Sequence, residues 1–113
     1  MGAVATALLI SLAMTGAMAG AGTDIIDHAT VTATKNGNVW HVTPTPEGRE
    51  LGSSAWSYDP TGEMELHGIP ATDTMVNQLR CHALFVPDKT EWQLEEARPT
   101  RTMSGEMSSG CNP

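Results

Sequence analysis

The sequence predicts a small α+β domain with one disulfide: an antiparallel sheet of about four short strands, one or two short helices and a long connection. Two observations support this fold class. Segments that alternate apolar and polar residues occur in two pairs, within 29–43 and within 80–95. A segment with helical spacing, residues 72–79, lies between the two pairs. A small all-β sandwich or barrel is the alternative.

The first two strands form a predicted hairpin. Residues 29–34 and 39–43 alternate apolar and polar side chains, and an Asn-Gly pair at 36–37 lies between them. Because Asn-Gly is the strongest two-residue turn signal, we expect this pair to form the turn. That register places Ala33 opposite Trp40 and leaves one face of the hairpin apolar.

A long connection follows the hairpin. Pro44 and Pro46 end the second strand, because prolines remove backbone donors from a sheet. Residues 47–71 contain several Gly and Pro residues and little regular patterning. A helical turn at 54–58 would bring Trp56 to the core. Connections of this length are often where function lies.

The second half of the chain supplies a helix and two further predicted strands. Thr72 or Asp73 caps the helix, which presents three apolar side chains on one side: Met75, Val76 and Leu79. We expect a third strand at 80–86 and a fourth at 91–95, the latter with two apolar residues inward, Trp92 and Leu94. Residues 102–109 are expected to make a helical turn.

The N-terminus predicts a secretory signal peptide. Residues 3–14 form an apolar run, which fits a signal's hydrophobic region and is shorter than the roughly 20 residues that span a bilayer. Ala17 and Ala19 fit an A-x-A cleavage site before Gly20. No Lys or Arg precedes the run, which leaves an upstream start open. N-terminal lipidation and a helix of the folded domain are the alternatives.

These features divide the chain into three parts and indicate where it acts. Residues 1–19 are the expected signal peptide, 20–27 a flexible N-terminus and 28–113 a single domain. The protein is therefore expected to be secreted or associated with the cell envelope, without a membrane span in its mature form.

The charge of the chain excludes some partners. The 113 residues carry a net charge of −7, and all 13 acidic and 6 basic residues lie from Asp24 onward. Nucleic acids and anionic membranes are held by clusters of Lys and Arg, which this acidic domain lacks. Neither is an expected partner. No cofactor is predicted.

Cys81 and Cys111 are the two cysteines of the chain. In an oxidising compartment an isolated pair most simply forms one disulfide, which would fasten the C-terminal end to the domain. A reactive thiol or a metal pair is the alternative, although the chain has no C-x-x-C spacing.

The weak metal candidates are Glu63, Glu65 and His67. Carboxylate and imidazole groups suit zinc or copper, and two-residue spacing would put all three on one face of an extended segment. The same spacing is typical of any solvated strand face, so a metal site is the less favoured interpretation.

Catalytic motifs are weak. No G-x-S-x-G elbow occurs in the sequence, and a hydrolase would need His82 or His67 as its base. The sequence therefore does not favour an enzyme.

Several short motifs in order resemble one family. The segments are Pro44-Thr45, Gly48-Arg49, Ala55-Trp56, Gln78, Cys81-His82, residues 92–95, Arg98-Pro99 and the Cys-Asn-Pro ending. Together they are similar to the domain-of-unknown-function 2599 family of small exported actinobacterial proteins. The resemblance implies export and a bridge between Cys81 and Cys111, but no catalytic residue or ligand.

The resemblance also singles out a polar cluster: Arg49, His82, Glu95 and Arg98. We expect the two arginines to pair with carboxylates or cap carbonyls, holding the long connection on the sheet; a recognition patch is the alternative. The leading hypothesis is a non-catalytic exported domain that binds a protein or an envelope polymer. A small secreted hydrolase and a weak metal-binding protein are the alternatives.

Overall fold

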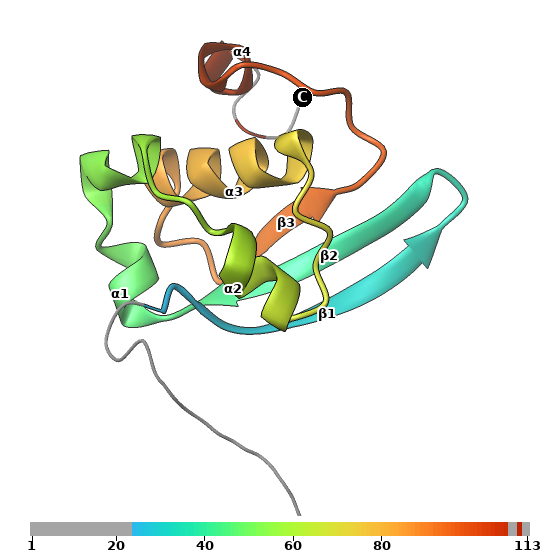
Figure 1. Ribbon diagram of the computed structural model, residues 1–113, viewed down its shortest axis with the longest axis horizontal. Coiled ribbons are helices and arrows are strands. Elements are labelled where there is room, and N and C mark those ends of the chain that lie inside the picture. The colour runs from blue at the N-terminus through green and yellow to red at the C-terminus, as the bar shows by residue number, and fades with distance from the viewer. Residues whose placement is uncertain (1–23, 109–110, 112–113) are drawn as a thin grey trace, which may run out of the picture.

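The computed structural model describes residues 24–108 and residue 111. In this part of the chain, three antiparallel strands form one sheet in the order β1-β2-β3: β1 is Ile26–Thr34, β2 is Gly37–Pro44 and β3 is Trp92–Glu95 (Figure 1). The helical elements are α1 (Pro46–Arg49), the 3-10 helix η1 (Gly52–Trp56), α2 (Thr61–Leu66), α3 (Asp73–Phe85) and α4 (Met103–Ser108). The α+β prediction is confirmed, with three strands in place of four. The predicted signal peptide lies outside the described residues.

The hairpin forms as predicted, but its register differs by two residues. Trp40 pairs with Val31, whereas the sequence placed it opposite Ala33. Residues 35–36 make the turn, and Gly37 begins β2 with a φ of 120°. Glycine adopts positive φ at little cost. Gly37, which was expected within the turn, therefore fits the first position of β2. Because the shift is even, every side chain stays on its predicted face.

The predicted third strand at 80–86 is wrong, because this segment is the second half of α3. The helix begins after Thr72, whose hydroxyl accepts from the Met75 N–H at 3.3 Å. It ends at Phe85, since Pro87 disfavours helical backbone in the residue before it. Short alternation resembles a strand, but the buried residues follow helical spacing: Met75, Gln78, Leu79, His82 and Ala83.

The long connection is more regular than its composition predicted. The turn expected at 54–58 is η1, and α1 and α2 lie on either side of it along the chain. Trp56 does not reach the core and stays 45% exposed, while its neighbour Ala55 is fully buried. Residues 63–67, whose metal-site interpretation required an extended segment, belong to α2 and its C-cap.

The core lies between the sheet and α3. Its buried side chains form one cluster that includes Val42, Trp92 and Leu94 from the strands and Met75, Leu79 and Ala83 from the helix. The inward positions predicted for β3 are therefore confirmed. Ile25 and Ile26 also belong to the cluster, so the folded part begins before residue 28, the start that the sequence indicated.

A disulfide fastens the C-terminal segment to α3. Cys81 and Cys111 are joined, with their Cα atoms 5.5 Å apart. The helical turn predicted at 102–109 is α4, which packs against α3. Within the described ranges, no helix has the length and apolar character that crossing a membrane requires.

Candidate functional site

An open pocket of about 420 Å³ lies between α3 and the segment that leads into α4. Its lining comes from two short stretches of chain: Asp73, Val76, Asn77 and Arg80 on α3, and Thr100, Arg101 and Thr102 after β3. The helix positions repeat every three or four residues, so they share one helix face. The pocket is therefore a groove between a rigid helix and an irregular segment.

Hydrogen bonds hold both walls of this pocket in place. The Arg80 Nε atom donates to the Tyr58 carbonyl at 2.7 Å, and an Arg80 terminal nitrogen lies 3.4 Å from the Asn77 Oδ1 atom. The amide of Asn77 donates to the Arg101 carbonyl at 2.7 Å, which ties the second wall to the helix. The side chain of Arg80 is thus oriented before any ligand arrives.

The charge of the pocket differs from that of the whole chain. Arg80 and Arg101 both line it, although the protein has only 6 basic residues and a net charge of −7. A guanidinium group recognises carboxylate or phosphate through paired hydrogen bonds. Asp73 on the same wall can accept a hydrogen bond from a hydroxyl or ammonium group. The pocket therefore suits an acidic group that carries a neighbouring donor.

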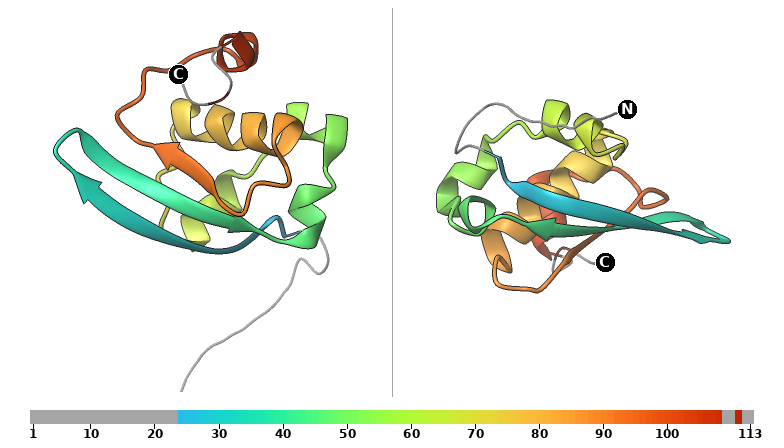
Figure 2. Two further views of the ribbon diagram at one scale, coloured as in Figure 1. Left: turned by 180° about the vertical axis from the view of Figure 1, so that it is seen from behind. Right: turned by 90° about the horizontal axis from the view of Figure 1, so that it is seen from below.

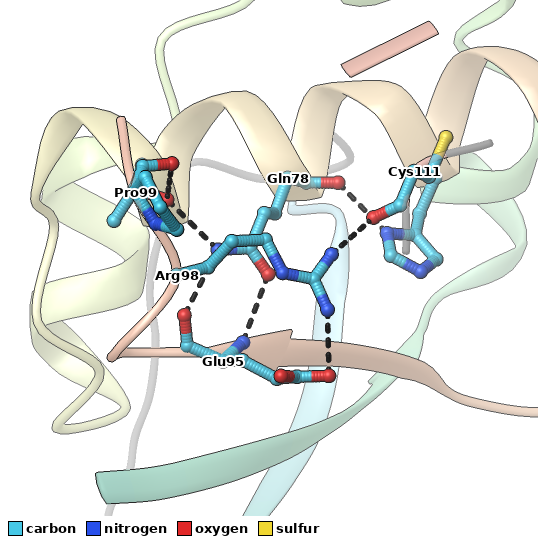
Figure 3. Close-up of polar contacts among 7 residues, drawn as sticks. Gln78, Glu95, Arg98, Pro99 and Cys111 are labelled. Atoms are coloured by element: carbon cyan, nitrogen blue, oxygen red, sulfur yellow. Dashed lines mark hydrogen bonds and ion pairs between the residues drawn. The ribbon is translucent and has the colours of Figure 1, made fainter. Parts of the chain in front are cut away.

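Two members of the predicted polar cluster, Glu95 and Arg98, form an ion pair at the end of β3. The Arg98 NH2 group donates to the Glu95 Oε2 atom at 2.6 Å, and its NH1 group donates to the Cys111 carbonyl at 2.8 Å (Figure 3). The Arg98 side chain is 5% exposed. These bonds connect β3 to the disulfide-linked segment, whereas Arg98 was expected from the sequence to hold the long connection on the sheet.

Arg49 lies apart from this pair and holds a different loop. Its guanidinium donates to the carbonyls of Pro87 and Lys89 at 2.7 and 2.6 Å, and to that of Thr90 at 3.3 Å. These three carbonyls belong to the connection between α3 and β3. Arg49 therefore fastens α1, part of the long connection, to the loop that leads into the sheet.

His82 is fully buried on α3. Its Nδ1 atom lies 2.8 Å from the Gln78 carbonyl, and its ring centroid is 6.4 Å from that of Trp92. Its Nε2 atom has no hydrogen-bond partner in the described part of the chain. Burial lowers the pKa of the imidazole, outweighing the hydrogen bond to Gln78. The neutral ring packs in the core, so it offers no base to a surface-bound substrate.

Glu63 binds the start of the domain. One carboxylate oxygen accepts from the N–H groups of Ile25 and Ile26 at 2.8 and 2.6 Å, and the other accepts from the Tyr58 hydroxyl at 3.1 Å. Burial raises the pKa of Glu63, and burial together with Glu63 raises that of Tyr58 to about 12. This carboxylate ties α2 to the beginning of β1.

The other two metal candidates do not join Glu63. Glu65 is exposed on α2, and His67 is the half-buried C-cap residue. The extended conformation that would align the three side chains is absent, because the segment is helical. In the ranges 24–108 and 111, no three His, Cys, Asp or Glu side chains gather in a way that could hold a metal ion.

The sequence reasoning missed Arg80, Arg101 and the buried Glu106. Arg80 was assigned to a strand, so its helical spacing from Asp73 and Asn77 went unused. Reading a single helix through residue 85 would have placed these three polar residues on one face. No local pattern marks Arg101 or Glu106, whose positions depend on how the C-terminal segment folds back.

Comparison with known proteins identifies a family. The family described as "Protein of unknown function (DUF2599)" matches residues 26–113. No curated protein and no solved structure matches the chain. The matched region covers every strand and helix described above. The chain therefore belongs to the DUF2599 family, as its ordered short motifs indicated.

Proposed function

We propose that this protein is an exported, non-catalytic binding domain, and that the pocket between α3 and residues 100–102 receives an acidic group of a protein or cell-envelope polymer. The observation that carries the proposal is that Arg80 and Arg101 both line one pocket of a strongly acidic chain. Long-range repulsion from the acidic surface selects against anions elsewhere, whereas two local cations favour them here.

The residue types in the pocket support binding over catalysis. The seven described residues that line it comprise arginine, asparagine, threonine, valine and one aspartate. These groups recognise ligands through charge and hydrogen bonds, but the set contains no His, Cys or Lys that would act as a base or nucleophile at neutral pH. Of the two histidines considered for hydrolysis, His82 is in the core and His67 does not line this pocket.

Export is supported by the predicted signal peptide and by the disulfide. Disulfides persist mainly in oxidising compartments, and the bridge between Cys81 and Cys111 closes a loop with a sequence separation of 30 residues. Intact-mass analysis of the protein from culture medium tests this part: a mature chain that begins at Gly20 supports export. An uncleaved chain in the cytosol with reduced cysteines contradicts it.

The binding test uses two sugars that differ by one acidic group. N-acetylmuramic acid carries a lactyl ether with a carboxylate in place of the 3-hydroxyl of N-acetylglucosamine, and the remaining hydroxyl and amide groups are the same. In an NMR titration we expect the acidic sugar alone to shift the amide signals of residues 73–80 and 100–102. Equal shifts with both sugars, shifts confined to other residues, or no shifts at millimolar concentration would contradict the proposal.

Variants assign the binding to the two arginines. Arg80→Gln and Arg101→Gln should each weaken binding of the acidic sugar at least tenfold, because each removes a charge-assisted contact. Lys89→Gln is the matched control, since it removes one positive charge from an exposed residue outside the pocket. Equal weakening by all three variants would indicate a non-specific charge effect and would overturn the assignment.

A further inference from the structure

The outer edge of β1 is an open strand edge. β1 lies at one side of the sheet, with β2 as its only neighbouring strand in the described chain. The Glu96 N–H bonds the Asn38 carbonyl at 3.0 Å, so the backbone groups of Asn38, Trp40 and Val42 face β3. The alternate residues of β2 therefore bond to β1.

The same alternation fixes which β1 groups are directed outward. Thr30, Thr32 and Thr34 are paired with the β2 residues that face β1, so their backbone groups bond across the hairpin. Ala29, Val31 and Ala33 then direct their N–H and C=O groups away from β2. Such a row of unpaired groups is a template for another strand.

Both ends of this open edge are fixed by the structure. At one end, Glu63 on α2 accepts from the N–H groups of Ile25 and Ile26, so α2 covers the edge there. At the other end, the strand stops at the turn of residues 35–36. The regular, accessible part of the edge therefore extends from residue 28 to residue 34, between the register shift at Ile26/His28 and the turn. Its midpoint is Val31.

The far part of the hairpin stands clear of the helices. Its tip projects beyond the end of α3 in each view (Figures 1 and 2). Residues 30–37 are exposed, and the Val31 side chain is 48% exposed. Residues 28–34 contain no Asp, Glu, Lys or Arg, and the charges and the bulge that commonly protect natural edge strands lie only at the two ends of this segment. The edge is thus accessible along 28–34.

The sequence of the edge is symmetric about its midpoint. Residues 29–33 read Ala-Thr-Val-Thr-Ala, which is identical in both directions. When two copies pair antiparallel with Val31 opposite Val31, alanines meet alanines and threonines meet threonines. Asp27, at the register shift, and Lys35, in the turn, flank the paired segment, so the Asp27 of each copy comes near the Lys35 of the other copy just beyond the regular pairing.

We propose that two copies of this protein associate through β1, antiparallel and centred on Val31, to form a continuous six-stranded sheet. The outward groups of Val31 bond to those of the second copy's Val31, and those of Ala29 bond to those of the second copy's Ala33. Cross-strand threonine pairs and the two Asp27–Lys35 pairs add to these bonds. This interface is independent of the ligand pocket, which lies on α3.

A second copy fits the edge better than an unrelated extended peptide. A peptide needs only backbone bonds, so it would require neither the symmetric sequence nor opposite charges at equal distances from the midpoint. Residues 27 and 35 are each four positions from Val31. The other edge of the sheet is not an equivalent site, because the Gln78 side chain bonds both backbone groups of Glu95 on β3.

Analytical ultracentrifugation of the purified protein tests the dimer. We expect a concentration-dependent monomer–dimer equilibrium for the wild type. Val31→Pro should shift it to monomer, because proline removes an outward donor that the β1–β2 ladder does not use. Phe85→Ser is the matched control: it removes a similarly exposed apolar side chain, 45% against 48%, at the end of α3 and should leave the dimer intact.

Charge exchange gives a second test that does not depend on the proline variant folding. Asp27→Lys and Lys35→Asp should each weaken the dimer at least tenfold, since each brings like charges near one another. The double variant D27K/K35D restores opposite charges and should recover dimerisation. A wild type that stays monomeric at millimolar concentration, a dimer that survives Val31→Pro, or a double variant no better than the singles would each overturn the proposal.

Discussion

The side chain of Gln78 bonds both backbone groups of Glu95. Its Oε1 atom accepts from the Glu95 N–H at 2.8 Å, and its Nε2 atom donates to the Glu95 carbonyl at 3.0 Å. Glu95 pairs with Val39 at a position where its own backbone groups point away from β2. The buried amide therefore takes the place of a fourth strand at this point of the β3 edge. It satisfies the two backbone groups of Glu95 that a further strand would otherwise bond.

Replacing Gln78 with leucine should lower the free energy of unfolding by about 2–6 kcal/mol, because two backbone groups of Glu95 lose their partners at about 1–3 kcal/mol each. Urea denaturation measures the change. Gln93→Ala on the exposed face of β3 is the control and should stay within about 0.5 kcal/mol of wild type. Equal effects of the two substitutions would show that the Gln78 bonds contribute little.

Removing the disulfide should lower stability by about 3–4 kcal/mol, as the chain-entropy model predicts for a closed loop of this size. The sequence separation of the two cysteines is 30 residues. Urea denaturation with and without reductant measures the loss. The double variant C81A/C111A is the control, because reductant should not change it; if reductant leaves the wild type equally stable, the bridge is not formed in solution.

Alanine at Arg98 should be more destabilising than alanine at Arg49. Arg98 is buried and bonds the Glu95 carboxylate and the Cys111 carbonyl, so we expect a loss of about 2–3 kcal/mol. Arg49 bonds three carbonyls at a more exposed loop, so we expect about 1 kcal/mol. Melting temperatures compare the two variants. An unchanged melting temperature for both would favour recognition over scaffolding.

The sequence predicted those parts of the fold that rest on local signals. The hairpin follows from alternation around Asn-Gly, and β3 follows from the inward spacing of Trp92 and Leu94. The error at 80–86 arose because a seven-residue stretch of alternating residues fits both periods, and packing against the sheet decides between them. Because the predicted helix ended at residue 79, the prediction did not include the polar face of α3.

The candidate site was less predictable than the fold. The pocket joins α3 to residues 100–102, and their approach depends on one long-range bond from Asn77 to the Arg101 carbonyl. Nothing in the local sequence of either segment indicates that bond. The motif residues Arg49 and Arg98 were easier to find because the family resemblance singled them out, and both bond backbone carbonyls.

Glu106 should make the protein less stable as the pH rises. Its side chain is fully buried on α4, and among residues 24–108 and 111 neither carboxylate oxygen has a hydrogen-bond partner. Burial raises its pKa, although the charges of Arg98 and Arg101 oppose the shift. The folded state therefore retains this proton to higher pH than the unfolded state, so stability falls between the ordinary carboxyl pKa and the raised one.

The variant Glu106→Gln isolates this effect, since a glutamine has nearly the same shape and does not titrate. It should match the wild type near pH 4 and be more stable at pH 7, by on the order of 1 kcal/mol. The variant must be compared with the wild type at each pH, because both proteins also lose stability as the pH falls. This loss comes from buried His82, whose pKa is lowered. Glu65→Gln, on exposed α2, should show no such divergence. If Glu106→Gln is instead less stable at pH 7 than at pH 4 relative to wild type, attraction to Arg98 and Arg101 outweighs the cost of burying the carboxylate.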